Sequence, residues 1–262
     1  MAEVARYEVA DGVATVTMDR PEARNALDAA LRRAVPTLVA RADADPEVAV
    51  VILTGADPAF CAGLDLKELG RDGGPLQPPG EEAVRPFSGS RASMLPTAKP
   101  VIGAVNGVAV TGGLELALHC DFLVASERAR FADTHARIGV QPAWGMTVLL
   151  PQAVGIRRAR EMSTTGNFVD AATALAWGLV NHVVPHEELM ACARSLAADI
   201  ASNDAGTLAT LLGTYEAGSR ATVAEAWEIE ARAFRSWQRD QMDPAEIERR
   251  RARVVERGRA QT

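Results

Sequence analysis

The sequence predicts an α/β fold that becomes mostly helical toward its end. Residues 48–54 form a continuous β-branched run, typical of a strand buried on both faces, and residues 99–105 lead from a proline into a second buried strand. Around them, apolar residues recur every three or four positions, which is the spacing of an amphipathic helix. Beyond about residue 150 that helical spacing dominates, with one strand-like piece at 181–184. This change of pattern is the domain boundary that the sequence indicates.

The first elements are a hairpin and a helix. Residues 7–10 and 13–18 alternate like short strands, and the turn dipeptide Asp11-Gly12 between them tolerates positive φ. From Asp28 onward, apolar residues fall on one helical face. They are Leu31, Val35 and Leu38.

The middle of the chain alternates loops, strands and a short helix. Residues 70–92 are so rich in Gly, Pro and charge that they predict an exposed, mobile loop, which could act as a lid. Asn106-Gly107 marks the turn after the second buried strand. Residues 112–119 then predict a short helix, and residues 121–125 predict a strand.

Composition excludes several classes of protein. With 262 residues, 48% of them hydrophobic and 24% charged, the chain can bury a sizeable core, which excludes disorder. Its apolar runs are far shorter than the roughly 18 residues of a membrane span, so we expect no membrane partner. The net charge of −6 argues against nucleic acid, whose binding needs a basic stripe. Three cysteines and no visible secretory signal lead us to expect a cytoplasmic protein.

The common catalytic motifs are missing. The chain has no Walker loop, no G-x-G-x-x-G after a strand, no G-x-S-x-G elbow and no H-E-x-x-H. Pro185 separates His182 from His186, so the two histidines would not share a helix face, and we expect no metal site. An aromatic stripe near the end of the chain is more typical of core packing or subunit contact than of ligand binding. It consists of Trp227, Ala231, Phe234 and Gln238.

The most informative stretch, 106–121, is rich in small residues. Small residues let the backbone come close to a ligand, and a helix beginning near Gly112 presents unpaired N–H groups at its positive dipole end. Glu115 falls on the same helical face as Gly112, so one turn could offer an oxyanion donor beside an acid or base. Alternatively, Glu115 only complements the helix dipole.

A second glycine-bearing segment, 59–68, follows the first buried strand. In an open sheet, ligands gather at the carboxyl ends of strands, so this loop and the turn at Gly112 could converge on one site. Two backbone N–H groups that donate to one carbonyl oxygen would form an oxyanion hole.

These residues resemble the crotonase (enoyl-CoA hydratase/isomerase) superfamily. The resemblance implies a spiral of ββα units over residues 1–200 and a helical trimerisation region over 201–262. It implies an enzyme of fatty acid metabolism that binds acyl-CoA thioesters as a homotrimer or a dimer of trimers. Coenzyme A would be part of the substrate, and no further cofactor is implied. The matching segments occur in the family's order over nearly the whole chain, at 20–27, 59–66, 99–107, 112–121 and 176–181.

The resemblance also implies roles for particular residues. The amides of Leu64 and Gly112 would hold the thioester carbonyl and stabilise the enolate that is the family's shared intermediate. Glu115 matches the first of two catalytic glutamates in the family's hydratases. The residues expected to border the substrate are Ala62, Asp65, Leu66, Gly113, Ala143 and Trp144.

His135 departs from the family's pattern. It stands where those hydratases carry the second glutamate, while Ala143 replaces a glycine and the bulky Trp144 follows it. His135 could itself be the acid or base, since imidazole titrates near neutral pH and Asp133 lies on the same side of an extended segment. Alternatively, Glu115 works alone, as in an isomerase, or His135 only lines the pocket. A protonated imidazole only donates, so we expect hydratase activity to fall at lower pH.

We therefore predict an enzyme that hydrates 2-enoyl-CoA, with Glu115 and His135 as acid and base. One alternative is an enoyl-CoA isomerase or another enolate-forming lyase. The other, from a different class, is an acyl-CoA-binding protein without catalytic activity. Turnover assays distinguish the two enzymes from the binding protein.

Overall fold

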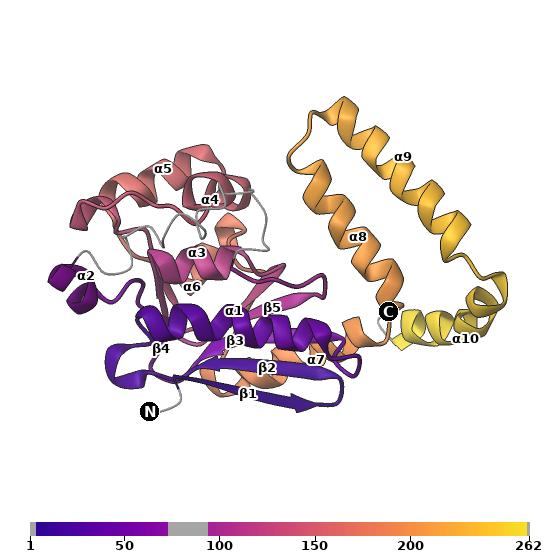
Figure 1. Cartoon of the computed structure of the whole chain (residues 1–262), viewed down its shortest axis with the longest axis horizontal. Helices are drawn as coiled ribbons and strands as arrows, with labels where there is room; N and C mark the ends of the chain where they lie inside the picture. The colour runs from indigo at the N-terminus through magenta and orange to yellow at the C-terminus, as the bar shows by residue number, and fades with distance from the viewer. Residues whose placement is uncertain (1–3, 73–93, 261–262) are drawn as a thin grey trace. The chain divides into compact units, whose positions relative to one another are not determined.

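The computed structural model of the chain describes residues 4–72 and 94–260 (Figure 1). The chain separates into two compact units, Met1–Asn203 and Asp204–Thr262, which are described in turn. Most of the predicted loop at 70–92 lies outside the described residues, and its first three residues close a helix, α2 (Leu66–Asp72). Among the helices of the described ranges, none is both long and apolar enough to span a membrane.

The first unit is built on a six-stranded sheet whose strand order follows chain order, β1-β2-β3-β5-β7-β10. The predicted hairpin is confirmed, because β1 (Ala5–Ala10) and β2 (Val13–Met18) pair antiparallel around Asp11 and Gly12, which both have positive φ. The other neighbouring strands of this sheet pair parallel. They are β3 (Val50–Gly55), β5 (Val101–Val105), β7 (Phe122–Ser126) and β10 (His182–Val184).

A second, four-stranded sheet gives this unit its spiral. After β3, β5 and β7 the chain adds a short strand to the second sheet before it enters a helical segment, so a ββα unit recurs as predicted. Because the first three short strands are parallel neighbours, the loops at their carboxyl ends lie next to one another. The short strands are β4 (Ala59–Cys61), β6 (Val108–Val110), β8 (Arg130–Ala132) and β9 (Val169–Asp170).

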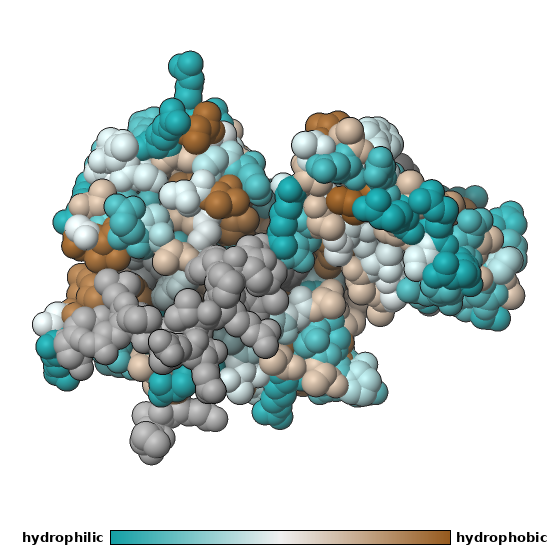
Figure 2. Space-filling model, turned by 45° about the horizontal axis from the view of Figure 1, so that its top comes forward, coloured by the Kyte–Doolittle hydropathy of each residue, from teal (hydrophilic) through white to brown (hydrophobic). Residues whose placement is uncertain are grey.

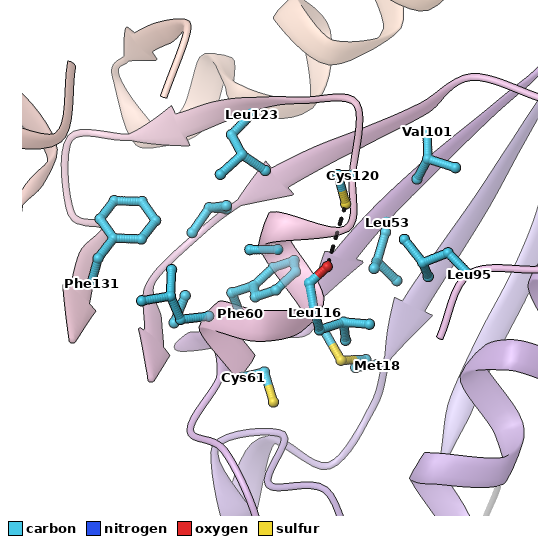
Figure 3. Packing of buried hydrophobic residues seen from close by; sticks show 14 of the residues in the cluster. Met18, Leu53, Phe60, Cys61, Leu95, Val101, Leu116, Cys120, Leu123 and Phe131 are labelled. Atoms are coloured by element: carbon cyan, nitrogen blue, oxygen red, sulfur yellow. Dashed lines mark hydrogen bonds between the residues drawn. The ribbon is translucent and has the colours of Figure 1, made fainter. Parts of the chain in front are cut away.

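Helices cover both faces of the six-stranded sheet. Helix α1 (Ala29–Ala44) begins where predicted, because the Asp28 carboxylate accepts a hydrogen bond from the Leu31 N–H at 2.8 Å. The core under α1 continues between the two sheets (Figure 3), and α7 (Leu189–Ala201) covers the opposite face. The remaining helical segments of the unit are η1 (Pro21–Ala23), α3 (Gly112–Leu118), η4 (Ala136–Ile138), α4 (Met146–Val154), α5 (Ile156–Thr165), α6 (Ala171–Trp177) and η5 (His186–Glu188).

In the second unit, the described residues form α8 (Ala205–Gly218), α9 (Val223–Asp240) and α10 (Pro244–Ala260). Helices α8 and α9 pack against each other. Two members of the aromatic stripe nevertheless stay open to solvent, since Trp227 is 69% exposed and Phe234 is 55% exposed. Figure 2 shows a few hydrophobic residues, in brown, among the mostly white and teal surface of this unit. The stripe is therefore not a core of the described chain, which favours its interpretation as a contact surface.

The side chain of Asn25 connects the backbone at Arg20 to the residues at and before the beginning of β4. Its side chain is fully buried, and its Oδ1 accepts a hydrogen bond from the Arg20 N–H at 2.8 Å. Its Nδ2 donates to the carbonyls of Ala56 at 2.8 Å and Ala59 at 2.7 Å. One amide group thus satisfies three backbone groups in the interior, where a missing partner costs free energy.

We expect Asn25→Ala to lower the free energy of unfolding of the first unit by about 2–4 kcal/mol, because it leaves buried backbone groups unpaired. Urea denaturation followed by circular dichroism measures the change. Asn203→Ala is the control, since that exposed side chain donates only at the surface, to the Asp199 carbonyl at 3.1 Å. The control should change the free energy by less than about 0.5 kcal/mol, and equal effects of the two substitutions would contradict the prediction.

Candidate active site

The loops that follow β4 and β6 meet through their backbones. A Cβ atom on Gly63 would collide with the side chain of Thr111, so only a glycine allows this approach. Gly63 also has φ of 91°, in the region that favours glycine. The predicted convergence of the two loops is therefore confirmed. It brings together Leu64 and Gly112, each the next residue along its segment.

Ala62 and Gly113, which we expected to border the substrate, lie where the same two loops meet. The Ala62 N–H donates to the Arg24 carbonyl at 3.0 Å. A Cβ on Gly113 would collide with the carbonyl of Cys61, so the start of α3 packs directly on the end of β4. Gly113 thus joins the two loops, whereas Ala62 ties the loop after β4 to the segment after η1.

The amides of Leu64 and Gly112 are left unused by this packing. Leu64 forms an isolated parallel bridge with Leu27. In that bridge, Leu27 donates to the Gly63 carbonyl at 2.7 Å and accepts from the Asp65 N–H at 3.2 Å. Gly112 opens α3, and the first N–H groups of a helix have no acceptor within it. Within residues 4–72 and 94–260, neither amide has an acceptor, so both are available to an outside oxygen.

Thr111 holds a strained backbone just before α3, with φ of 47° and ψ of −117°. Residues with a Cβ rarely adopt this conformation, and such strain gathers at functional sites. The Thr111 N–H donates to the Ala132 carbonyl at 3.0 Å, and its carbonyl accepts from the Glu115 N–H at 2.9 Å. The end of β8 and the first turn of α3 thereby hold the turn that presents Gly112.

Glu115 lies in the interior, only 1% exposed, and reaches a distant segment. Its Oε1 accepts hydrogen bonds from the Trp144 N–H at 2.8 Å and the Met146 N–H at 3.2 Å. Burial raises the pKa of Glu115, and these hydrogen bonds offset that effect only in part. A carboxyl with a raised pKa keeps its proton to higher pH and is suited to donating it. Glu115 therefore does more than complement the dipole of α3.

The ring of His135 lies between two carboxyl groups. Its Nδ1 is 2.7 Å from Oδ1 of Asp133, which also accepts from the His135 backbone N–H at 3.2 Å. Because an ionised carboxylate only accepts, Nδ1 carries the proton and Nε2 holds the lone pair of the neutral ring. That Nε2 lies 3.7 Å from Oε2 of Glu115. Asp133 thus lies beside His135 as expected, but through a turn and not an extended segment, since His135 has φ of −52° and ψ of −47°.

The pKa values of Asp133 and Glu115 shift in opposite directions, although both side chains are buried. Burial acts to raise the pKa of Asp133, but hydrogen bonds from His135 and from the Ser163 hydroxyl hold it below its ordinary value. Asp133, His135 and Glu115 therefore form a buried line in which the first carboxyl is charged and the last has a raised pKa. A reacting atom beside the last two could be reached by both.

The segment 142–146 reaches Glu115 through its backbone. Ala143 is exposed, and the N–H groups that hold Glu115 come from Trp144 and Met146. His119 also contacts this segment, since its Nε2 lies 2.8 Å from the Trp144 carbonyl. Sequence reasoning missed His119, although its place one helical turn after Glu115 was a signal.

Asp65 and Leu66 form the beginning of α2. The Asp65 carboxylate pairs with the Arg20 guanidinium at 3.1 Å and accepts from the Lys67 N–H at 3.0 Å. Burial acts to raise the pKa of Asp65, but the hydrogen bond from Arg20 brings it below its ordinary value. Asp65 therefore shapes the loop, and Leu66 is 55% exposed beside it. The sequence did not single out Arg20, although the match at 20–27 contained it.

The two histidines of the strand-to-turn segment have other partners. His182 is an exposed residue of β10. The ring of His186 lies 3.1 Å from Oδ2 of Asp57 and 3.1 Å from Oγ of Ser126. Among the residues that the structure describes, no group of three or more His, Cys, Asp or Glu could hold a metal ion.

Comparisons with known proteins identify relatives of this chain. A family model described as enoyl-CoA hydratase/isomerase matches residues 8–258. A protein of Rhizobium meliloti named probable enoyl-CoA hydratase is 37% identical over 235 residues, which cover 89% of either chain. A crystal structure of enoyl-CoA hydratase from Mycobacterium avium is 49% identical with a TM-score of 0.74, covering 91% of this chain and 100% of that one. Another, from Bacillus anthracis, is 31% identical with a TM-score of 0.83, covering 96% and 97%.

We expect Glu115→Gln to be more stable than the parent at neutral and alkaline pH. Because the pKa of Glu115 is raised on folding, its contribution to stability is fully present below the unfolded value and is lost as pH rises through the folded value. Glutamine stays neutral, and its Oε1 can keep both backbone hydrogen bonds. The gain should therefore vanish in acid, below the ordinary range of a glutamate.

Urea denaturation of the parent and of Glu115→Gln at a series of pH values measures this difference. Glu127→Gln is the control, since Glu127 is exposed and its change should leave the stability nearly constant with pH. A parent that is the more stable protein at neutral pH would show that the stated direction is wrong.

Proposed function

Because this chain belongs to the enoyl-CoA hydratase/isomerase family, we propose that it adds water to 2-enoyl-CoA thioesters. The observation that carries the proposal is the buried pair Glu115 and His135, with Oε2 and Nε2 3.7 Å apart. Hydration needs an acid, a base and a place for negative charge. The pair supplies the first two, and the unused amides of Leu64 and Gly112 supply the third.

The two amides would act as an oxyanion hole for the thioester carbonyl. When the oxygen of water bonds to the β carbon, negative charge moves through the α carbon to the carbonyl oxygen and an enolate forms. Two N–H donors on that oxygen stabilise the charge, and the loss of one such donor typically costs about 2.7–4 kcal/mol of transition-state stabilisation. The strained turn at Thr111 supports this role, since backbone strain of this kind gathers at functional sites.

The protons balance between the two side chains. In the proposed reaction, Nε2 of His135 accepts a proton from water while the oxygen of that water bonds to the β carbon. The protonated carboxyl of Glu115 then gives its proton to the α carbon, where the enolate holds electron density. The imidazolium returns a proton to the Glu115 carboxylate, which restores both groups. Asp133 supports this cycle because a charged partner on Nδ1 stabilises the imidazolium.

The substrate brings the coenzyme A, and the proposed reaction uses nothing besides water. Addition of water to a double bond involves no net oxidation or reduction, so no redox group takes part in it. The low cysteine content supports a cytoplasmic location, which we propose together with a role in fatty acid metabolism.

We expect the parent to hydrate crotonyl-CoA, as followed by the loss of the conjugated enoyl absorbance. Glu115→Gln and His135→Ala should each lower kcat by about 10²–10⁴-fold, the usual contribution of a general acid or base. Activity of the parent should fall toward acid pH, because a protonated imidazole cannot accept a proton from water. His182→Ala is the control, since His182 is exposed on β10, and it should keep the parent's kcat.

His135→Glu separates a catalytic histidine from one that only lines the pocket. It restores the second glutamate expected from the family resemblance. If the parent is inactive and gains hydratase activity on this change, that result would contradict a catalytic role of His135. Turnover of 3-enoyl-CoA in place of hydration would support an isomerase that relies on Glu115.

We further propose that the chain forms a homotrimer or a dimer of trimers through its second unit. Exposed aromatic side chains on α9 support this, because solvated patches of that kind are typical of subunit contacts. Within the unit, α8 and α9 also border a groove of about 610 Å³ that is lined by Leu211, Tyr215 and Phe234 among others. A second copy of the chain would bury these side chains.

We expect the parent to sediment as a trimer or hexamer and the double variant Trp227→Glu, Phe234→Glu to sediment as a monomer. Charges on the exposed stripe would be costly to bury against a second copy. Sedimentation velocity measures the change. Phe168→Glu is a matched control, since Phe168 is a 52% exposed aromatic residue of the first unit, and it should leave the assembly intact. A monomeric parent would contradict the proposal.

A further inference from the structure

The side chains of Glu115, within α3, and of His119, directly after it, hold the backbone of Trp144. Its N–H donates to Oε1 of Glu115 at 2.8 Å, and its carbonyl lies 2.8 Å from Nε2 of His119. Since a carbonyl only accepts, His119 carries its proton on Nε2 and donates. Glu115 and His119 are four residues apart and project from one face at the end of the helix. The position of Trp144 is therefore set by the same helix that carries the carboxyl of the active site.

Gly145 allows this close contact. Its φ is 104°, a conformation that side chains with a Cβ rarely adopt. A Cβ there would lie 3.1 Å from a methyl group of Leu149 and 3.5 Å from Nε2 of His119. With glycine at this position, the chain can turn into α4 immediately after Trp144, which fixes the direction in which the indole leaves the backbone.

The indole of Trp144 lies directly against Gly112. A Cβ on Gly112 would be 2.8 Å from Cζ3 and 3.3 Å from Cε3 of the ring. The side chain of Leu27 borders the same point, at 3.4 Å from that position. Gly112 is the residue whose amide is available to an outside oxygen. The benzene edge of the indole therefore forms a wall beside the residue whose amide would bind that oxygen.

A thioester bound there would have its acyl group confined on two sides. If its carbonyl oxygen accepts from the Gly112 amide, the α and β carbons follow within two bonds and lie between the indole and the pair Glu115 and His135. Trp144 is half-buried and packs against the main core, so neighbouring core side chains restrict the movement of its ring. Close-packed side chains do not give way to extra methylene groups without cost.

We propose that Trp144 is the specificity-determining residue that restricts the site to short acyl groups, and that His119 is the positioning residue that holds it. This inference rests on the proposed function, because it takes the Gly112 amide as the binding site of the thioester carbonyl. A pocket that is mismatched by a single methylene discriminates by about 10–200-fold, so an indole in the path of the chain has a large effect.

Binding of saturated thioesters tests the inference without turnover. We would titrate butyryl-CoA and decanoyl-CoA into the parent, Trp144→Ala and Trp144→Phe by isothermal calorimetry. The parent should favour butyryl-CoA. Trp144→Ala should raise the affinity for decanoyl-CoA relative to butyryl-CoA by at least about tenfold, and Trp144→Phe should change the ratio less, in keeping with its size.

His119 is tested through the same ratio. His119→Leu removes the donor to the Trp144 carbonyl and should move the ratio part of the way toward that of Trp144→Ala. His119→Gln keeps a donor at a similar reach and should restore the parent's ratio. In the Trp144→Ala background, His119→Leu should have no further effect on the ratio, because a positioning residue acts only through the residue that it holds.

Trp177→Ala is the matched control. Trp177 is also a partly buried tryptophan that packs against the main core, and it closes α6. Its loss should leave the ratio unchanged, whatever it does to stability, which circular dichroism checks for every variant. An unchanged ratio in folded Trp144→Ala, or a change of the same size in Trp177→Ala, would overturn the inference.

The outcomes for the two proposals are distinguishable. A protein that binds both thioesters but hydrates no enoyl-CoA would overturn the proposed function, and the ratio would still decide the role of Trp144. A parent that binds decanoyl-CoA more tightly than butyryl-CoA would overturn the restriction to short chains, even if hydration were observed. Failure to bind either thioester would overturn both.

Discussion

The close backbone contact between the loops after β4 and β6 is the constraint on which the rest of the site depends. There is no room for a Cβ at Gly63 or Gly113. Glycine at these two positions lets the strained turn at Thr111 lie against the end of β4. This contact exposes two amides at one place and aims the first turn of α3 at the segment that carries Trp144. Side chains then add chemistry to a frame that the backbone has already built.

The electrostatics of the site depend on two buried carboxyl groups whose pKa values shift in opposite directions. Asp133 receives donors from His135 and Ser163 and stays charged, whereas Glu115 is so deeply buried that its pKa rises despite two backbone donors. The imidazole between them is therefore asymmetric, with a proton fixed toward Asp133 and a lone pair toward Glu115. A histidine in the place of a second glutamate thus has a specific environment.

Local patterns made most of the fold predictable, while long-range contacts were beyond them. Asp11-Gly12 marked the hairpin, Asp28 marked the beginning of α1, and the glycines marked the converging loops, because each acts on its immediate neighbours. The pairing of Arg20 with Asp65, and of His119 with Trp144, joins residues far apart in the chain that show no shared periodicity. The sequence therefore indicated the residues of the proposed site, and tertiary packing determined which groups hold them in place.

The order of the strands has a consequence for synthesis on the ribosome. Since the six-stranded sheet is built in chain order, each emerging strand can add to an edge that already exists, without waiting for a later segment to fill a gap. The exception is α7, which covers the face formed by Val50, Ile52 and Ile102 and is made well over a hundred residues after the first of them. A nascent chain that stalls before Leu189 would present this apolar face to chaperones.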